Sequence, residues 1–421
     1  MDRIIFHCDC NNFFASCECL ERPELKDVPM AVAGDPQRRT GVVVAKNELA
    51  KKFGVKTTDT VFAAQKKCPQ IVFVPPRHGL YSKISRDVNR IYAEYTDYVE
   101  PASIDESYLD MTGYLGGKWE EARAAADELR RRVREEIGVT ISVGVSFNKV
   151  FAKLGSDMKK PDATTLISRA NYPEMVWGLP VTDMLFVGRA AGELLKKHYI
   201  MTIGDLAQAP EEMLTRLLGK GGPSLKRHAC GEDREPVRRM GEHDEIKSVS
   251  RGMTFPRDLV TEEEVRSALS MLADDVSTQL RRRNMKGSVI QLQIKTPGLV
   301  SVSRQVTLPY CVCTRHEILE SACQLVRSHW RVGQDMPIRA MTVGVTHLGH
   351  AEEIREQMSL FDVIADTPQP PEHSHAARQK QEKLEAAIDK IRDKHGRSII
   401  QAGLAADDDI GLISHRPHRG K

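Results

Sequence analysis

The sequence lacks any apolar run approaching the roughly 20 residues that a membrane-spanning helix needs. We also expect no secretory signal, because the strand-like RIIF (3–6) comes first, without a basic and then apolar leader. None of its nine cysteines forms a C-x-x-C pair, so a zinc site is not expected. We find no internal repeat. These absences predict a cytoplasmic protein with free thiols and no membrane partner.

A strong excess of one charge sign is also missing, since the 421 residues carry a net charge of only +3. That charge is uneven: residues 247–349 contain 14 Lys and Arg against 9 Asp and Glu. A basic module on a nearly neutral chain suggests a polyanionic partner, although chance unevenness stays open. The length predicts about two to four domains.

The pattern of apolar residues changes along the chain. Residues 1–167 alternate short apolar runs, typical of strands, with helical spacing such as that from Trp119 to Ile137, which Gly138 ends. This predicts an α+β layer with helices on one face of a largely antiparallel sheet. From about Pro173 to Cys230 the pattern is helical and punctuated by glycine, and residues 247–349 are mixed again.

Three acidic residues are candidates for chemistry: Asp9, which ends the first predicted strand, and the adjacent Asp105 and Glu106. Neighbouring strand residues point to opposite faces, so both acids reach one site only where the backbone bends or one approaches from the rim. Clustered carboxylates suit Mg²⁺, and a pair of such ions about 4 Å apart serves nucleotidyl transfer. The alternative is that the Asp-Glu pair is an ordinary solvated corner.

Longer motifs favour the first interpretation. They are D-x-N-N-F-F (9–14), F-G-V-K-T (53–57), V-E-P-A-S-I-D-E-S-Y-L-D (99–110) and V-G-V-S-F-N-K-V-F-A-K-L-G-S-D-M-K-K-P (143–161). In this order they closely resemble the Y-family DNA polymerases, the translesion enzymes of the bacterial DNA polymerase IV and UmuC type. The resemblance covers roughly residues 1–350. It implies a low-fidelity, template-directed polymerase, expected to act as a monomer on primer–template DNA and dNTPs.

The resemblance also implies a right-hand polymerase fold with a ferredoxin-like palm. Its expected parts are a palm (1–10 and 78–168), small fingers (11–77), a helix-hairpin-helix-like thumb (169–230), a linker (231–246), an α/β little finger (247–349) and a tail (350–421).

The family's palm places three carboxylates on two Mg²⁺ ions. By motif these are Asp9, Asp105 and Glu106, with the backbone carbonyl of Cys10 completing one coordination shell. A catalytically weak accessory protein tethered to a clamp is the alternative function. Such a protein would be expected to lose these ligands, and this chain retains them.

Other residues of the resemblance concern the incoming nucleotide. Phe14 would lie under its sugar and exclude a 2′-hydroxyl, the group that distinguishes RNA from DNA, while Phe13 is interpreted as core. Lys160 would bind the triphosphate from the palm. Lys149 and Lys153 are interpreted as structural or DNA-facing.

The fingers depart from the family pattern. Glu48 stands in the place of its usual tyrosine and Lys51 in the place of its usual arginine. Lysine keeps the charge of arginine but loses the planar fork. Whether Lys46 or Asn47 compensates stays open.

DNA contacts are expected from the thumb and the basic module. Glycine turns that open thumb helices suit phosphate binding. In the basic module we predict DNA contacts at Lys247, Arg251 and Arg304. The arginines at 281–283 are equally consistent with a solvated helix end.

The tail contains QMSLFD (357–362), which resembles the bacterial sliding-clamp-binding peptide. Gln357, Leu360 and Phe361 are the predicted clamp contacts. A later helical stripe of Leu384, Ile388 and Ile391 is expected to fold back or to bind a partner.

Overall fold

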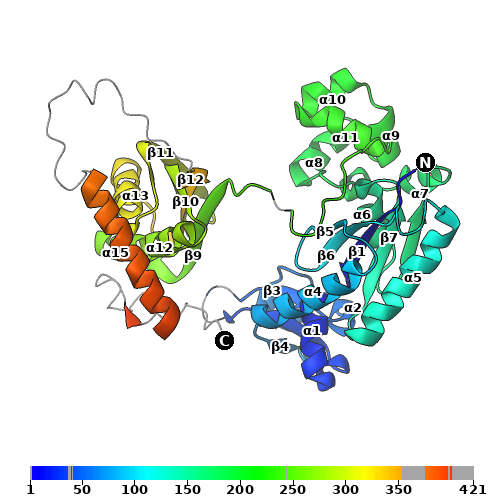
Figure 1. Ribbon diagram of the computed structural model, residues 1–421, viewed down its shortest axis with the longest axis horizontal. Helices are drawn as coiled ribbons and strands as arrows, with labels where there is room; N and C mark the ends of the chain where they lie inside the picture. Colours follow the sequence, from blue (N-terminus) through cyan, green and yellow to red (C-terminus); the bar gives the residue numbers. More distant parts are fainter. Residues whose placement is uncertain are drawn as a thin grey trace. The chain divides into compact units, whose positions relative to one another are not determined.

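The computed structural model describes residues 2–36, 39, 41–242, 244–352, 375–396 and 399–400 (Figure 1). It divides into two compact units, residues 1–36 with 41–243 and residues 37–40 with 244–421. The clamp-binding peptide predicted at Gln357, Leu360 and Phe361 lies outside the described residues. Within the part of the chain that the structure describes, no helix has the length and apolar character needed to cross a membrane.

The palm is built on a five-stranded sheet in the order β5-β6-β1-β7-β8. Its strands are β1 (Ile5–Cys10), β5 (Val99–Pro101), β6 (Glu106–Asp110), β7 (Ile141–Ser146) and β8 (Thr164–Ile167). All neighbours are antiparallel except β7 and β8. The predicted, largely antiparallel α+β palm is therefore confirmed.

Helices cover both faces of this sheet. On one face, Phe6 and Cys8 of β1 pack with α4 (His78–Ala93) and α5 (Trp119–Glu136), which ends at Gly138 with φ +89°. On the other, α6 (Lys149–Met158) lies against Ile5 and His7. The sequence predicted helices on one face only. The difference follows from β1, which is buried along its whole length and so needs cover on both sides.

The fingers contain a small sheet in the order β3-β2-β4. Its elements are α1 (Phe13–Glu21), β2 (Met30–Ala33), β3 (Val43–Lys46), α2 (Glu48–Lys52), α3 (Val61–Lys67) and β4 (Val72–Val74), with a 3-10 turn η1 (Pro23–Lys26). The three strands confirm the strand pattern read from the sequence.

The thumb is helical, as predicted. Its elements are α7 (Tyr172–Val176), η3 (Val181–Asp183), α8 (Arg189–Lys197), α9 (Ile203–Gln208), α10 (Glu211–Leu218) and α11 (Gly221–Ala229). Helices α10 and α11 approach closely at Gly222, where a Cβ atom would lie 2.3 Å from the carbonyl oxygen of Leu214. Only glycine fits that approach.

Much of the segment predicted as a linker (231–246) lies against the palm. The backbone N–H of Arg238 donates to Glu100 Oε2 at 2.9 Å, and that of Met240 donates to the carbonyl of Asp97 at 3.0 Å. Val237 is buried with Ile5. The first part of this segment is therefore a strap on the palm.

The little finger has a four-stranded antiparallel sheet in the order β11-β10-β12-β9. Its elements are β9 (Ser248–Leu259), α12 (Glu262–Arg282), β10 (Met285–Lys295), β11 (Ser301–Val312), α13 (Arg315–His329) and β12 (Ile338–His350). Buried residues of α12 and α13 share one core with the sheet. The α/β character predicted for this part is confirmed.

Helix α15 (His375–His395) folds back onto α12 and α13 (Figure 1). Its charged face is the buried one: Arg281 pairs with Glu385 and Asp389, and Arg392 with Asp274. In the apolar stripe Leu384 is 54% and Ile391 42% exposed, and Ile388 is half-buried. Leaving Arg281 and Asp274 of α12 buried without a charged partner would cost more free energy than exposing the apolar residues of α15.

Candidate active site

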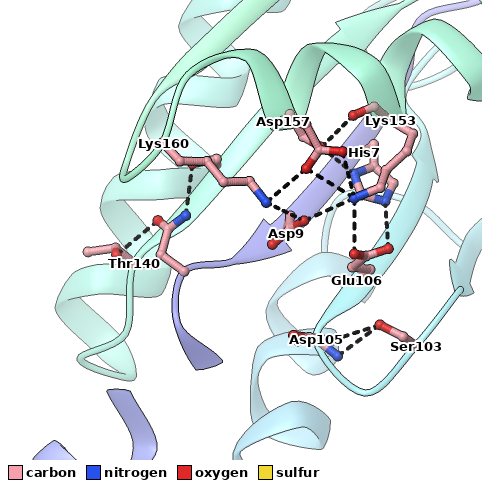
Figure 2. Close-up of polar contacts among 12 residues, drawn as sticks. His7, Asp9, Ser103, Asp105, Glu106, Thr140, Lys153, Asp157 and Lys160 are labelled. Carbon is pink, nitrogen blue, oxygen red and sulfur yellow. Dashed lines mark hydrogen bonds and ion pairs between the residues drawn. The ribbon is translucent and has the colours of Figure 1, made fainter. Parts of the chain in front are cut away.

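Asp9 and Glu106 lie directly opposite each other on neighbouring strands of the palm. Asp9 of β1 pairs with Glu106 of β6 in antiparallel register, so their side chains share one face of the sheet (Figure 2). The Asp9 side chain is only 8% exposed and that of Glu106 28%. Two carboxylates almost 100 positions apart in the chain thus converge at one partly buried place.

Asp105 reaches the same region from a turn. The N–H groups of Ala102 and Ser103 both donate to the carbonyl of Glu106, and the N–H of Cys10 donates to the carbonyl of Asp105 at 2.9 Å. Asp105 therefore lies in a backbone bend just before β6, which is one of the two conditions under which adjacent acids can approach one site. The Asp105 carboxylate lies toward Ser103, whose hydroxyl donates to it at 2.7 Å (Figure 2). Burial, with added repulsion from the Asp9 and Glu106 charges, raises the pKa of Asp105.

One lysine bridges Asp9 and Glu106, and a second contacts Asp9. Lys153 Nζ lies 3.1 Å from Asp9 Oδ2 and 3.0 Å from Glu106 Oε1, and Lys160 Nζ lies 2.7 Å from Asp9 Oδ2. Lys153 was interpreted from the sequence as structural or DNA-facing, and the structure places it inside the site. Its helical spacing gave no signal of this, because the contact depends on how α6 crosses β1.

The carboxylates suit a hard cation in chemistry and position. A positive group already lies about equally far from Asp9 and Glu106, and oxygen ligands are those Mg²⁺ prefers. Among the described residues, no group of three or more His, Cys, Asp or Glu is arranged to hold a metal ion. The reason is local: Asp105 is bonded to Ser103, and ammonium groups stand beside the other two acids.

His7, on the same strand as Asp9, contacts the Glu106 carboxylate. It precedes Asp9 by two residues on β1, so both side chains share a face. His7 Nδ1 lies 2.8 Å from Ser156 Oγ, and Nε2 lies 3.5 Å from Glu106 Oε2, at the limit of a hydrogen bond. Burial lowers the pKa of His7. The contact with His7 and the Lys153 ammonium together hold the pKa of Glu106 below its ordinary value.

The loop that carries Lys160 is tied to the end of β1. Asn11 Oδ1 accepts the N–H of Asp162 at 2.9 Å, and the Asn11 amide donates to Ser142 Oγ at 2.9 Å. Arg130 of α5 binds the Asp162 carboxylate at 2.8 Å. Sequence reasoning missed Asn11 and Asp162, although Asn11 stands inside the quoted D-x-N-N-F-F motif.

Comparison with known proteins agrees with this architecture. Residues 8–157 match the impB/mucB/samB family and residues 246–360 its C-terminal domain. A DNA polymerase IV from Acetivibrio thermocellus is 42% identical, with 97% of this chain and 98% of the relative covered. The chain belongs to the Y family of DNA polymerases. It is a DNA-directed DNA polymerase of the translesion type.

Other Y-family proteins extend the comparison. DNA polymerase IV 1 from Bacillus subtilis is 36% identical over 95% of this chain and 92% of its own. The solved structure of the Y-family DNA polymerase chimera Dbh-Dpo4(243-245)-Dbh matches with a TM-score of 0.74 and 24% identity, covering 82% of this chain and 98% of the chimera. This likeness confirms the right-hand fold predicted for a Y-family polymerase.

The two phenylalanines that end the first Y-family motif, Phe13 and Phe14, differ in burial. Phe13 is buried in the palm core, which confirms its interpretation. Phe14 is half-buried and stacks on Tyr81, with ring centroids 4.2 Å apart and planes 13° from parallel. The Tyr81 hydroxyl donates to the buried Glu18 carboxylate at 2.7 Å. Phe14 therefore sits on a fixed aromatic base.

The unusual fingers residues of this Y-family chain contact one another. Glu48 Oε1 accepts from Asn12 at 2.9 Å and lies 3.5 Å from Lys51 Nζ. The Asn47 amide caps α2 and bonds to the backbone of Met30 and Val28. Lys46 and Asn47 were the two residues considered as replacements for the missing tyrosine and arginine. The side chain of Asn47 is already used in these structural hydrogen bonds.

The predicted DNA contacts of the little finger differ in their surroundings. Lys247 is exposed just before β9. Arg251 pairs across the sheet with the buried Val343, and so lies on the helix-covered side, 3.4 Å from Asp275 of α12. Arg304 is exposed on β11, the edge strand.

Proposed function

We propose that this polymerase catalyses nucleotidyl transfer from dNTPs to a primer 3′ end with two Mg²⁺ ions held by Asp9, Asp105, Glu106 and the Cys10 carbonyl. The observation that carries the proposal is the cross-strand pairing of Asp9 with Glu106, beside a turn that presents Asp105. Ions bound there would activate the primer hydroxyl and stabilise the leaving oxygen. Asp105 would exchange its bond to Ser103 for a place among the ligands.

Lys160 would bind the incoming triphosphate from the palm. Its side chain is 31% exposed beside Asp9, in a loop that Asn11 and Arg130 hold through Asp162. A triphosphate needs cationic partners besides its metal ions. From the fingers, Lys51 would add a second, more mobile positive charge, since it is 54% exposed.

Phe14 would act as the sugar filter. The ring is supported from one side by Tyr81, and Glu18 and its arginine partners hold Tyr81 in turn. A rigid aromatic surface excludes a 2′-hydroxyl better than one that can move away.

The little finger would bind the DNA backbone in a salt-dependent and largely sequence-independent way. The sheet face opposite α12 and α13 carries small polar side chains, among them Ser250, Thr342, Gln291 and Gln305. Lys247, just before β9, would add positive charge beside it, whereas Arg251 and Arg304, which pair with the buried Val343 and Leu292, would contact DNA from the helix-covered side. We propose that the peptide at Gln357, Leu360 and Phe361 tethers the monomeric polymerase to the bacterial sliding clamp.

Primer extension on undamaged and abasic templates tests the catalytic assignment. The double variant Asp105→Ala/Glu106→Ala should lose at least about 100-fold in rate on both templates, because the metal ions that would stabilise the transition state lose two of their ligands. Glu120→Ala/Glu121→Ala, which removes two adjacent exposed acids from α5, is the matched control and should extend normally. Equal extension by all three proteins would remove the assignment and favour the accessory function.

A further inference from the structure

Lys153 occupies the place between Asp9 and Glu106 where a cation is needed. Its side chain is 16% exposed, and its ammonium touches both carboxylates at about the same distance. Its ammonium therefore lies between two acids that would otherwise repel one another.

A further carboxylate shares the lysine partners of Asp9 and Glu106. Asp157, one helical turn after Lys153 on α6, lies 3.1 Å from Lys153 Nζ and 2.9 Å from Lys160 Nζ (Figure 2). It is 47% exposed, in contrast to the buried Asp9. Asp157 thus offers Lys153 a second, more solvated partner on the same helix.

We propose that Lys153 is the resident counter-ion of the metal-free site and that Asp157 receives it when a divalent ion binds. In this exchange Asp9 and Glu106 release the ammonium, which keeps its contact with Asp157. Lys153 competes with the ion, and Asp157 lowers the cost of its displacement. The inference rests on the proposed metal site and assigns roles to two residues outside it.

The charge balance gives the sign of each effect. Without Lys153, Asp9 and Glu106 face each other with less compensation, so the metal-free protein should be less stable and a divalent ion should bind more tightly. Without Asp157, Lys153 has only Asp9 and Glu106 as partners, so an ion should bind more weakly. The effect of Asp157 requires Lys153, and should vanish in the double variant.

The chain provides two matched controls on or next to α6. Lys149 is a buried lysine paired with Glu100 and Glu235, away from Asp9. Lys149→Met should therefore lower stability equally with and without metal. Lys159 is exposed and adjacent to Lys160, so Lys159→Met tests whether any nearby positive charge has the same effect as Lys153.

The experiment measures Mn²⁺ binding to the full-length chain by electron paramagnetic resonance, and thermal unfolding in EDTA and in Mn²⁺. Lys153→Met should bind Mn²⁺ at least about tenfold more tightly and regain in Mn²⁺ the melting temperature it loses in EDTA. Asp157→Asn should bind several-fold more weakly, and Lys153→Met/Asp157→Asn should bind like Lys153→Met. Lys159→Met should match the wild type.

Two results would overturn the inference while leaving the metal site intact. One is wild-type Mn²⁺ affinity in Lys153→Met. The other is equal weakening by Asp157→Asn with and without Lys153, which would mean a simple charge effect. If the wild type binds no Mn²⁺ and Asp9→Asn changes nothing, the proposed metal site falls and the inference falls with it.

Discussion

Single residues of the palm show an imbalance of charge at the site. Asp9, Glu106 and Asp157 are matched by only two ammonium groups, Lys153 and Lys160, and Asp105 adds a further acid nearby. Such an excess of partly buried negative charge is costly unless cations enter. The site is therefore suited to divalent ions that arrive together with substrate phosphates.

The sugar filter makes a prediction at the same scale. Phe14→Ala should improve the use of ribonucleotides relative to deoxyribonucleotides by up to about 100-fold in kcat/KM, because the ring proposed to block a 2′-hydroxyl is gone. Phe62→Ala is a suitable control, since Phe62 is 78% exposed on α3. Single-nucleotide insertion kinetics with matched dNTP and rNTP measure the ratio. Unchanged discrimination in Phe14→Ala would count against the filter.

Among the elements, the strap over residues 232–242 shows how a connecting segment becomes part of the palm. Glu100 of β5 is its anchor, because it accepts from Lys149 at 2.9 Å, from the Arg238 backbone at 2.9 Å and from the Arg238 guanidinium at 3.0 Å. The carboxylate is almost fully buried. Without it, Lys149 would keep a buried charge with only the exposed Glu235 as partner.

Glu100→Gln should therefore lower the free energy of unfolding by about 3 kcal/mol at pH 7. Burial by itself would raise the pKa of Glu100, but the hydrogen bonds from Lys149 and Arg238 together have the larger effect and hold this pKa below its ordinary value. A pKa lowered by folding gives stability that is complete above the unfolded-state pKa and is lost as pH falls through the folded one. The difference between wild type and variant should stay constant from pH 7 to about 5 and shrink below about pH 4.

Urea unfolding followed by circular dichroism at pH 7 and at pH 3.5 measures this difference. Glu128→Gln, which removes an exposed carboxylate paired with Arg131 on α5, should change little at either pH. A Glu100→Gln defect of the same size at both pH values would show that the carboxylate charge is not responsible.

The whole molecule consists of two units, which we propose supply different parts of the activity. The first contains the site carboxylates with Phe14 and Lys160, and the second contains the basic little finger and the helix α15. The peptide proposed to bind the clamp follows the little finger in the sequence. Catalysis and tethering should therefore be separable by mutation.

Leu360→Ala/Phe361→Ala should abolish pull-down by the bacterial sliding clamp while leaving primer extension without the clamp unchanged, because an apolar pair inserted in a pocket provides most of such binding. Leu384→Ala removes an exposed leucine of α15 and serves as the control. Retained pull-down by the double variant would mean that another surface binds the clamp.

Local patterns were sufficient for most elements of this protein. Short apolar runs in residues 1–167 predicted strands such as β2, β3 and β7, and the three-to-four-residue spacing from Trp119 predicted α5 with its glycine end. The order of the motifs was sufficient to predict the family. The resemblance to that family then indicated Asp9, Asp105, Glu106 and Phe14 as candidate site residues. These features depend on neighbours in the chain, which a sequence displays directly.

Tertiary structure alone decided which side chains meet. Lys153 reaches Asp9 from 144 positions away, and Arg281 meets Asp389 of α15 from 108 positions away. The segment predicted as a linker lies against the palm because Arg238 binds Glu100. Each of these is a charged group that burial forces to find an opposite charge, and the partner is set by strand register and helix crossing, which the residue's own neighbours do not encode.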